Sequence, residues 1–193
     1  MKEEVDRALK SGDSVGGVFE VVAHRVPPGL GSYANWDERL DGLLAQALMS
    51  LQAVKAVEIG GGVSAAAASG SAVHDEIGYD ASAAGPSRFT RKSNHAGGIE
   101  GGISNGEDIR VRGYLKPIST LRRPLASVSF ATRQPVEAAY ERSDVCVVPA
   151  AGVGAEAMVA LTLARCALEK FGGDSMMETL RNLRGYAEQL RNF

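Results

Sequence analysis

The sequence has little that would place the protein outside the cell or in a membrane. Among its 193 residues are only two cysteines, Cys146 and Cys166, and their wide spacing suits neither a metal-binding pair nor a disulfide framework. The first residues lack the apolar stretch of a secretory signal. The longest apolar run, 155–164, contains Glu156 and is too short to span a bilayer. We therefore expect a cytoplasmic protein with reduced thiols and no membrane contact.

Charge of either sign is also not in excess. The chain has 21 basic and 23 acidic residues and a formal net charge of −2, which argues against a general binder of polyanions. The pair Arg122-Arg123 is too short for nucleic-acid recognition, so we expect no nucleic-acid partner. Hydrophobic residues make up 45% and charged residues 23% of the chain, as in globular proteins. This length suits one domain over 1–193 with a buried core.

The common cofactor signatures are absent as well. The sequence contains no phosphate-binding loop of the Gly-x-x-x-x-Gly-Lys-Ser/Thr type and no dinucleotide-binding glycine motif between a strand and a helix. It has no Gly-x-Ser-x-Gly nucleophile turn either. The string His74-Asp75-Glu76 offers metal-ligand side chains, but adjacent ligands rarely converge on one ion. We expect a capping or loop role for it, and no metal site.

Glycine, by contrast, is abundant and clustered. The chain has 23 glycines, well above the usual fraction of about 7%. Three lie at 60–62 and five more fall between Gly97 and Gly106. Such clusters mark places where the backbone adopts a positive φ or approaches another group closely.

The hydrophobic pattern predicts helices and hairpins without a repeating βαβ rhythm. Asn35 and Glu38 form a candidate capping box at the start of one helix, and Asn105-Gly106 predicts a hairpin between 98–104 and 108–115. The segment 64–87 is rich in Ala, Ser and Gly and is expected to be a long loop. This mixture favours an α+β fold, a layered helix/sheet domain. We expect helices over 3–10, 36–51, 154–171 and 175–190, and strands over 14–26, 53–59 and 145–148.

Three polar strings are candidates for ligand binding. In the first, 93–107, Asn and Ser side chains can hydrogen-bond a ligand, and paired glycines allow a flat ligand to pack on bare backbone. A flexible hairpin whose glycines only serve its turns explains this string equally well.

The second string, Lys116-Pro117-Ile118-Ser119-Thr120, combines a point charge, a stiffening proline and two hydroxyls that can donate to phosphate or ring oxygens. In the third, Arg142 suits bidentate binding of an anion, and Asp144 would point the same way from an extended strand. The alternatives are a proline-initiated turn with a solvated lysine and a surface salt bridge. Taken singly, each alternative is the simpler reading.

In order and spacing, these strings together resemble the chorismate synthase family over nearly the whole chain, from Gly12 to about Leu168. The glycine-rich string and the Lys-Pro string are the most specific parts of the resemblance. The matching segments are Gly12–Gly17, Met49–Lys55, Val57–Gly60, His74–Glu76, Ser93–Ile99, Gly101–Gly106, Lys116–Thr120 and Arg142–Pro149.

The resemblance implies half of the chorismate synthase fold and an enzyme of the shikimate pathway of aromatic amino-acid biosynthesis. That enzyme converts 5-enolpyruvylshikimate 3-phosphate to chorismate and phosphate, a trans-1,4 elimination that needs reduced FMN. The resemblance also implies a carbon–oxygen lyase that assembles as a homotetramer, with the flavin reduced either by NADPH on the enzyme itself or by a separate reductase. By resemblance, Asp144 assists proton handling near the flavin. The implied flavin contacts are Gln52, Ala53, Asn94, Gly101, Lys116, Pro117, Ile118, Ser119, Thr120 and Arg142.

The family chain is about twice as long as this one, and its N-terminal half carries two catalytic histidines and several substrate-binding arginines. None of the strings that hold them occurs in this sequence. We expect the isolated chain to be inactive, because no group remains for acid catalysis toward the leaving phosphate. We also expect exposed core surface where the other half would pack. The alternative is a non-catalytic fragment that binds flavin or serves a structural role.

Overall fold

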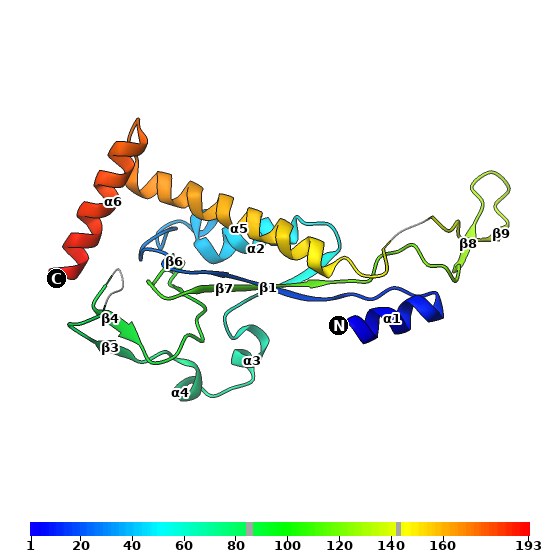
Figure 1. The fold of residues 1–193 in the computed structure, drawn as a ribbon, viewed down its shortest axis with the longest axis horizontal. Helices are drawn as coiled ribbons and strands as arrows, with labels where there is room; N and C mark the ends of the chain where they lie inside the picture. Colours follow the sequence, from blue (N-terminus) through cyan, green and yellow to red (C-terminus); the bar gives the residue numbers. More distant parts are fainter. Residues whose placement is uncertain (84–86, 142–143) are drawn as a thin grey trace.

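The computed structural model describes residues 1–83, 87–141 and 144–193. Together they form an elongated molecule with the two helical ends far apart (Figure 1). In chain order the elements are α1 (Lys2–Ser11), β1 (Gly17–Ala23), η1 (Trp36–Glu38), α2 (Leu40–Met49), β2 (Val54–Ile59), α3 (Gly62–Ala66), α4 (Gly70–Val73), β3 (Ile77–Tyr79), β4 (Phe89–Arg91), β5 (Ile99–Glu100), β6 (Ile103–Ser104), β7 (Ile109–Leu115), β8 (Ala126–Val128), β9 (Pro135–Glu137), α5 (Val148–Phe171) and α6 (Met176–Arg191).

The main sheet of the described residues is antiparallel, with its three strands in the order β1-β7-β2. Along the central strand β7, Ile109, Val111 and Leu115 are buried on one side. The residues between them, Arg110 and Arg112, point to the other side because strand side chains alternate. The sheet therefore has one apolar and one polar face, as expected for an antiparallel sheet that is covered on one side.

Helices α2 and α5 cover the apolar face (Figure 1). Leu40, Leu44 and Leu48 lie four residues apart on one side of α2 and are fully buried, as an amphipathic helix requires. From α5, Val159 and Cys166 reach the same core. This sheet-and-helix layering confirms the predicted α+β class.

The remaining elements extend from this two-layer body. Helix α1 and the β8–β9 hairpin lie at one end and α6 at the other, whereas α3, α4 and the β3–β4 hairpin lie on the side of the sheet away from α5 (Figure 1). Helix α6 begins as predicted: the Ser175 hydroxyl accepts a hydrogen bond from the backbone N–H of Glu178, which caps the first turn.

The predicted hairpin around Asn105-Gly106 is wrong. The strand after it, β7, pairs with β1 and β2, and the actual hairpin joins β5 to β6 through Gly101-Gly102. Both of these glycines have a positive φ, 63° and 90°, which a tight two-residue turn needs. Asn105 instead accepts a hydrogen bond from the N–H of Glu107 in a local turn.

The predicted helix at 36–51 begins later than its capping box. A short 3₁₀ turn, η1, is followed by the extended Arg39, and α2 starts at Leu40. The Leu40 N–H donates to the carbonyl of Gly102, so the β5–β6 turn takes the place of a side-chain cap. Trp36, the first residue of η1, is 85% exposed.

Two further segments differ from the expectation. Residues 145–148, predicted as a strand, do not form one. Helix α5 begins at Val148 rather than at residue 154, because Pro149 suits the first turn of a helix. In the segment 64–87, expected as a loop, the described residues include most of α3, all of α4 and strand β3. Alanine favours such short helical turns, and β3 gains its hydrogen bonds by pairing with β4.

Candidate functional site

A cavity of about 420 Å³ lies where β7 ends. Lys116 directly follows this strand, and the chain then turns through the Lys-Pro string. Much of the lining was predicted from sequence as ligand-binding. The lining residues are Ala53, Lys116, Ile118, Ser119, Thr120, Asp144 and Val147.

Backbone hydrogen bonds hold the segments around this cavity. The N–H of Lys116 donates to the carbonyl of Ala53 at 2.9 Å, and the hydroxyl of Ser14 donates to the carbonyl of Ile118 at 2.8 Å. The N–H of Val15 donates to the carbonyl of Val145 at 2.9 Å. Ser14 and Val15, just before β1, thus connect the Lys-Pro string to the segment that precedes α5.

The polar groups of the cavity are accessible to a ligand. Lys116 and Asp144 are both exposed, and neither forms an ion pair with another residue that the structure describes. An ammonium group and hydroxyls suit an anion or electron-rich oxygens, and a carboxylate can accept a proton. Ala53, Ile118 and Val147 add apolar surface on which a flat ring can pack.

Of the other residues predicted for the site, those that the structure describes do not line this cavity. Gln52 is exposed in the turn beside Ala53, and Pro117 is exposed beside Lys116. Arg142 lies outside the described residues.

Asn94 and Gly101 lie at the opposite end of β7. The Asn94 side chain donates to the carbonyl of Asp108, just before β7, and accepts from the N–H of Gly98. At about 3.3 Å per residue, Asp108 lies about 26 Å along the strand from Lys116. Gly101 belongs to the turn whose Gly102 carbonyl accepts a hydrogen bond from Leu40, the first residue of α2. The Lys116 cavity instead includes Ala53, which follows the last residue of that helix. Within one chain these two residues are therefore separate from the Lys116 cavity.

Asp75 organises the loop that contains Asn94. One carboxylate oxygen accepts from the Ser93 hydroxyl at 2.6 Å and the His95 N–H at 2.8 Å; the other accepts from the Ala96 N–H at 2.8 Å. Burial alone would raise the pKa of Asp75, but these hydrogen bonds and the nearby His95 lower it below its ordinary value. The loop role predicted for the His74–Glu76 string is thus confirmed for Asp75. The described residues contain no cluster suited to a metal ion.

Sequence reasoning missed a buried carboxylate on the other face of the sheet. Glu58 of β2 accepts hydrogen bonds from Tyr114 at 2.7 Å and from Arg112 at 2.5 Å. The hydrogen bond from Tyr114 lowers the pKa of Glu58, burial opposes this, and Arg112 lowers it further. Glu58 borders a cavity of about 670 Å³ beside α3. The alternation of side chains along a strand indicates that Arg112 and Tyr114 lie on the same face of β7. The pairing of β2 with β7, which brings Glu58 to them, is not visible in the sequence.

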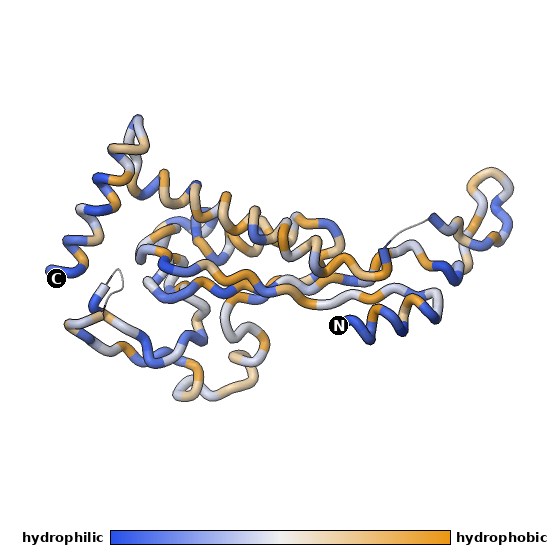
Figure 2. Tube along the Cα trace, viewed as in Figure 1, coloured by the Kyte–Doolittle hydropathy of each residue, from blue (hydrophilic) through white to orange (hydrophobic). Residues whose placement is uncertain are grey.

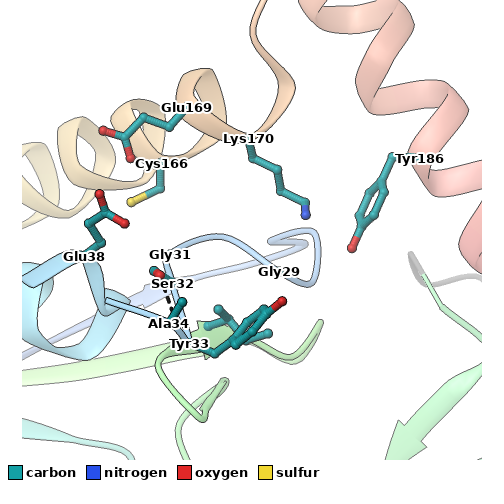
Figure 3. A pocket seen from close by; sticks show the side chains of 11 residues that line it. Gly29, Gly31, Ser32, Tyr33, Ala34, Glu38, Cys166, Glu169, Lys170 and Tyr186 are labelled. Atoms are coloured by element: carbon teal, nitrogen blue, oxygen red, sulfur yellow. Dashed lines mark hydrogen bonds between the residues drawn. The ribbon is translucent and has the colours of Figure 1, made fainter. Parts of the chain in front are cut away.

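Another cavity, of about 740 Å³, contains no residue that the sequence analysis singles out for chemistry. It lies between the loop 29–34 and the helices α5 and α6 (Figure 3). Its Lys170 Nζ lies 4.3 Å from the centre of the Tyr186 ring, and the Tyr186 hydroxyl donates to the carbonyl of Pro28. These contacts brace α6 against the body of the molecule.

Comparisons with known proteins agree with the resemblance seen in the sequence. The model of the chorismate synthase family matches residues 1–168. Chorismate synthases of Koribacter versatilis and Acidobacterium capsulatum are 72% and 71% identical over the whole of this chain, which covers 49% and 50% of their lengths. A solved structure described as "Crystal Structure of Chorismate Synthase" is 44% identical with a TM-score of 0.82; the match covers all of this chain and 49% of that chain.

The class that fold and site define is a mixed helix–sheet domain corresponding to half of a larger enzyme chain. The chain spans about half the length of the curated relatives that it matches. It belongs to the chorismate synthase family.

Proposed function

We propose that this chain is the flavin-binding C-terminal part of a chorismate synthase. The complete enzyme would convert 5-enolpyruvylshikimate 3-phosphate to chorismate and phosphate, as a lyase of the shikimate pathway. One observation carries the proposal: Ala53, Lys116, Ile118, Ser119, Thr120 and Asp144 border one cavity. All six are positions at which the family resemblance implies a role, and they come from three separate parts of the sequence.

The cavity residues fit reduced FMN as the cofactor. Lys116 can bind an anionic or electron-rich part of the flavin, and the hydroxyls of Ser119 and Thr120 can donate to its oxygens. Ile118 and Val147 offer apolar surface for the ring system. When bound, reduced flavin supplies electron density as the phosphate leaves and takes it back when the proton is lost. The chain's own part is to bind and orient.

Asp144 is our candidate for proton handling. Its exposed carboxylate borders the cavity, so it can take up a proton from a neighbouring group at a carboxylate oxygen. Phosphate departure also needs an acid, and the three histidines are engaged or placed elsewhere. The His24 ring pairs with Asp108, His74 ends α4, and His95 lies in the loop that its backbone N–H ties to the Asp75 carboxylate. We propose that the chain needs the other half of the family sequence for turnover, within a cytoplasmic homotetramer.

Flavin binding under anaerobic conditions tests this proposal. Reduced FMN should bind the chain, and Lys116→Ala should weaken that binding by about ten-fold, the loss of one charge-assisted contact. Lys55→Ala is the matched control, because Lys55 is an exposed lysine of β2 outside the cavity lining. Equal effects of the two substitutions would contradict the assigned site.

Turnover is tested by mixing the chain with the complementary half of the Koribacter versatilis relative. Chorismate should form from 5-enolpyruvylshikimate 3-phosphate in the mixture and not with either half alone. Flavin binding without chorismate in the mixture would favour the non-catalytic alternative. Loss of both would overturn the enzyme proposal.

A further inference from the structure

One of the strings that carry the family resemblance, residues 12–17, connects α1 to β1 and lies outside the Lys116 cavity. Figure 2 shows hydrophilic residues recurring along α1 and mostly hydrophobic residues along β1. The chain therefore passes here from the solvent into the core. None of the residues 12–17 lines the cavity, so any part that this string has in ligand binding acts through other residues. We call it the 12–17 segment.

The 12–17 segment runs beside the Lys-Pro string. The Ser14 hydroxyl donates to the carbonyl of Ile118 at 2.8 Å, and the N–H of Arg123 donates to the carbonyl of Gly12 at 3.2 Å. These two hydrogen bonds lie on either side of residues 119–120 in the chain. The hydroxyls of those two residues are the candidate donors to flavin oxygens, so the segment fixes the backbone before and after them.

Gly16 brings the two backbones into direct contact. A Cβ at this position would lie 2.2 Å from the carbonyl oxygen of Leu115 and 3.0 Å from the nitrogen of Pro117. Both are backbone atoms, which could move aside only if the end of β7 and the start of the Lys-Pro string moved with them. Only glycine allows so close an approach.

The 12–17 segment also holds a second part of the cavity wall. The N–H of Val15 donates to the carbonyl of Val145 at 2.9 Å, and Val145 directly follows Asp144. Lys116 and Asp144 border the same cavity but come from separate parts of the sequence. One short segment thus connects the two parts of the chain that supply the charged groups of the site.

The hydrogen bond from Ser14 to Ile118 is the side-chain contact in this arrangement. Ser14 is 7% exposed, and a buried hydroxyl normally keeps a hydrogen-bond partner. Residues 116–120 form neither a helix nor a strand, so contacts from outside the string must fix their backbone. A backbone that is fixed in this way favours binding, because less order has to be imposed when the ligand arrives.

We propose that Ser14 is a positioning residue of the flavin cavity. Its hydroxyl fixes the backbone of the Lys-Pro string at Ile118 and thereby directs the side chains of residues 119–120 toward the ligand. Ser14 itself does not border the cavity. This role rests on the proposed flavin site, but the hold on the string can be measured without flavin.

Hydrogen exchange at single amides measures that hold. The Lys116 amide is protected by the Ala53 carbonyl and exchanges when the string opens locally. Ser14→Ala should speed this exchange by about five-fold, the effect of one lost hydrogen bond. The amide of Ala96, which donates to Asp75 at the other end of β7, should be unchanged. Equal acceleration at both amides, or none at Lys116, would overturn the proposal.

Ser11→Ala is the matched control for this measurement. The Ser11 hydroxyl also donates to a backbone carbonyl, that of Ala8 at 3.0 Å, but this bond stays within the end of α1. The substitution should leave the exchange of Lys116 unchanged. A response as large as that of Ser14→Ala would show that the string senses any loss of stability near α1, and the positioning role would fall.

Binding of reduced FMN under anaerobic conditions gives the second readout. Ser14→Ala should raise the Kd by about five-fold, measured well below the melting temperature. Val159→Ala is the control for stability, because Val159 is a core residue of α5 outside the cavity lining. It should lower the melting temperature at least as much and leave the Kd unchanged. An unchanged Kd for Ser14→Ala, or an equal rise for Val159→Ala, would contradict the positioning role.

Gly16→Ala tests the same contact without removing a hydroxyl. The backbone shift that its Cβ forces should also raise the Kd by about five-fold or more. Gly152→Ala in α5, where a Cβ would meet Phe19 at an ordinary 3.7 Å, should leave the Kd unchanged. Normal FMN binding by Gly16→Ala would show that the 12–17 segment does not set the position of the string.

The flavin site and the positioning role fail in different ways. Absence of FMN binding by the wild-type chain would overturn the proposed flavin site, whatever Ser14→Ala does to the exchange of Lys116. FMN binding by the wild-type chain that Ser14→Ala does not weaken would overturn the positioning role alone.

Discussion

The backbone N–H of Lys116 donates a 2.9 Å hydrogen bond to the carbonyl of Ala53. This contact joins the end of β7 to the turn before β2, and both residues border the candidate flavin cavity. Ala53 adopts a left-handed conformation with φ 67°, which is strained for a residue with a side chain. The position of the Lys-Pro string therefore depends on an unfavourable backbone conformation nearby, as is common at functional sites.

Ala53→Gly should stabilise the chain. Glycine accepts a positive φ without strain, and this gain exceeds its entropic cost by about 0.5 to 1 kcal/mol. Urea denaturation should show a higher free energy of unfolding. The control is Ala56→Gly in β2, which should lower it, because glycine weakens a strand. A lower value for Ala53→Gly would contradict the strain argument.

Gly62→Ala should destabilise the chain strongly. An added Cβ would lie 1.7 Å from Cγ of Glu58, and φ is 43°. Glu58 would have to leave Arg112 and Tyr114 while remaining partly buried, at a cost of about 2 to 4 kcal/mol. Thermal or urea unfolding measures the loss. At the neighbouring Gly61, where φ is −72°, alanine should cost far less; equal losses would mean that the Glu58 contacts do not matter.

Asp75→Asn should destabilise the chain at neutral pH by about 1 to 3 kcal/mol, the range for hydrogen bonds to a charged acceptor. The pKa of Asp75 is lowered in the folded chain. Its carboxylate therefore stabilises the fold above the unfolded-state pKa of about 3.9, and this contribution is lost as pH falls through the folded-state pKa.

Urea unfolding of wild type and Asp75→Asn between pH 7 and pH 3 checks this prediction. The difference between them should shrink toward the acid end. Asp37→Asn, an exposed site in η1, is the control and should leave stability nearly unchanged. A difference that stays constant with pH would show that the carboxylate charge is unimportant.

Asp144→Asn should slow turnover more than it weakens flavin binding. The amide keeps the size of the side chain but cannot take up a proton. The measurement is made in a full-length family chain, by comparing the rate of chorismate formation with the affinity for reduced FMN. Asp174→Asn, in the turn before α6, should change neither. Equal losses of turnover and flavin affinity would make Asp144 a structural residue.

Features decided by neighbouring residues could be predicted from the sequence. Ser175 marks the start of α6, and the leucines of α2 fall four apart, because helix caps and helical faces depend on residues within a few positions. The strings that carry the family resemblance are local too, and the comparisons confirm the family. Six of the predicted site residues border one cavity, although their assignment to flavin stays a prediction.

Pairing between distant segments was decided only by the tertiary structure. Asn105-Gly106 has the local signature of a hairpin, yet β7 gains more hydrogen bonds and more buried surface between β1 and β2. Leu40 receives its cap from the distant Gly102, which overrides the capping box at Asn35. The sequence alone determined the family, the α+β class and the chemical groups available. Which strands pair, and therefore which groups meet, depends on contacts far apart in the chain that no local pattern encodes.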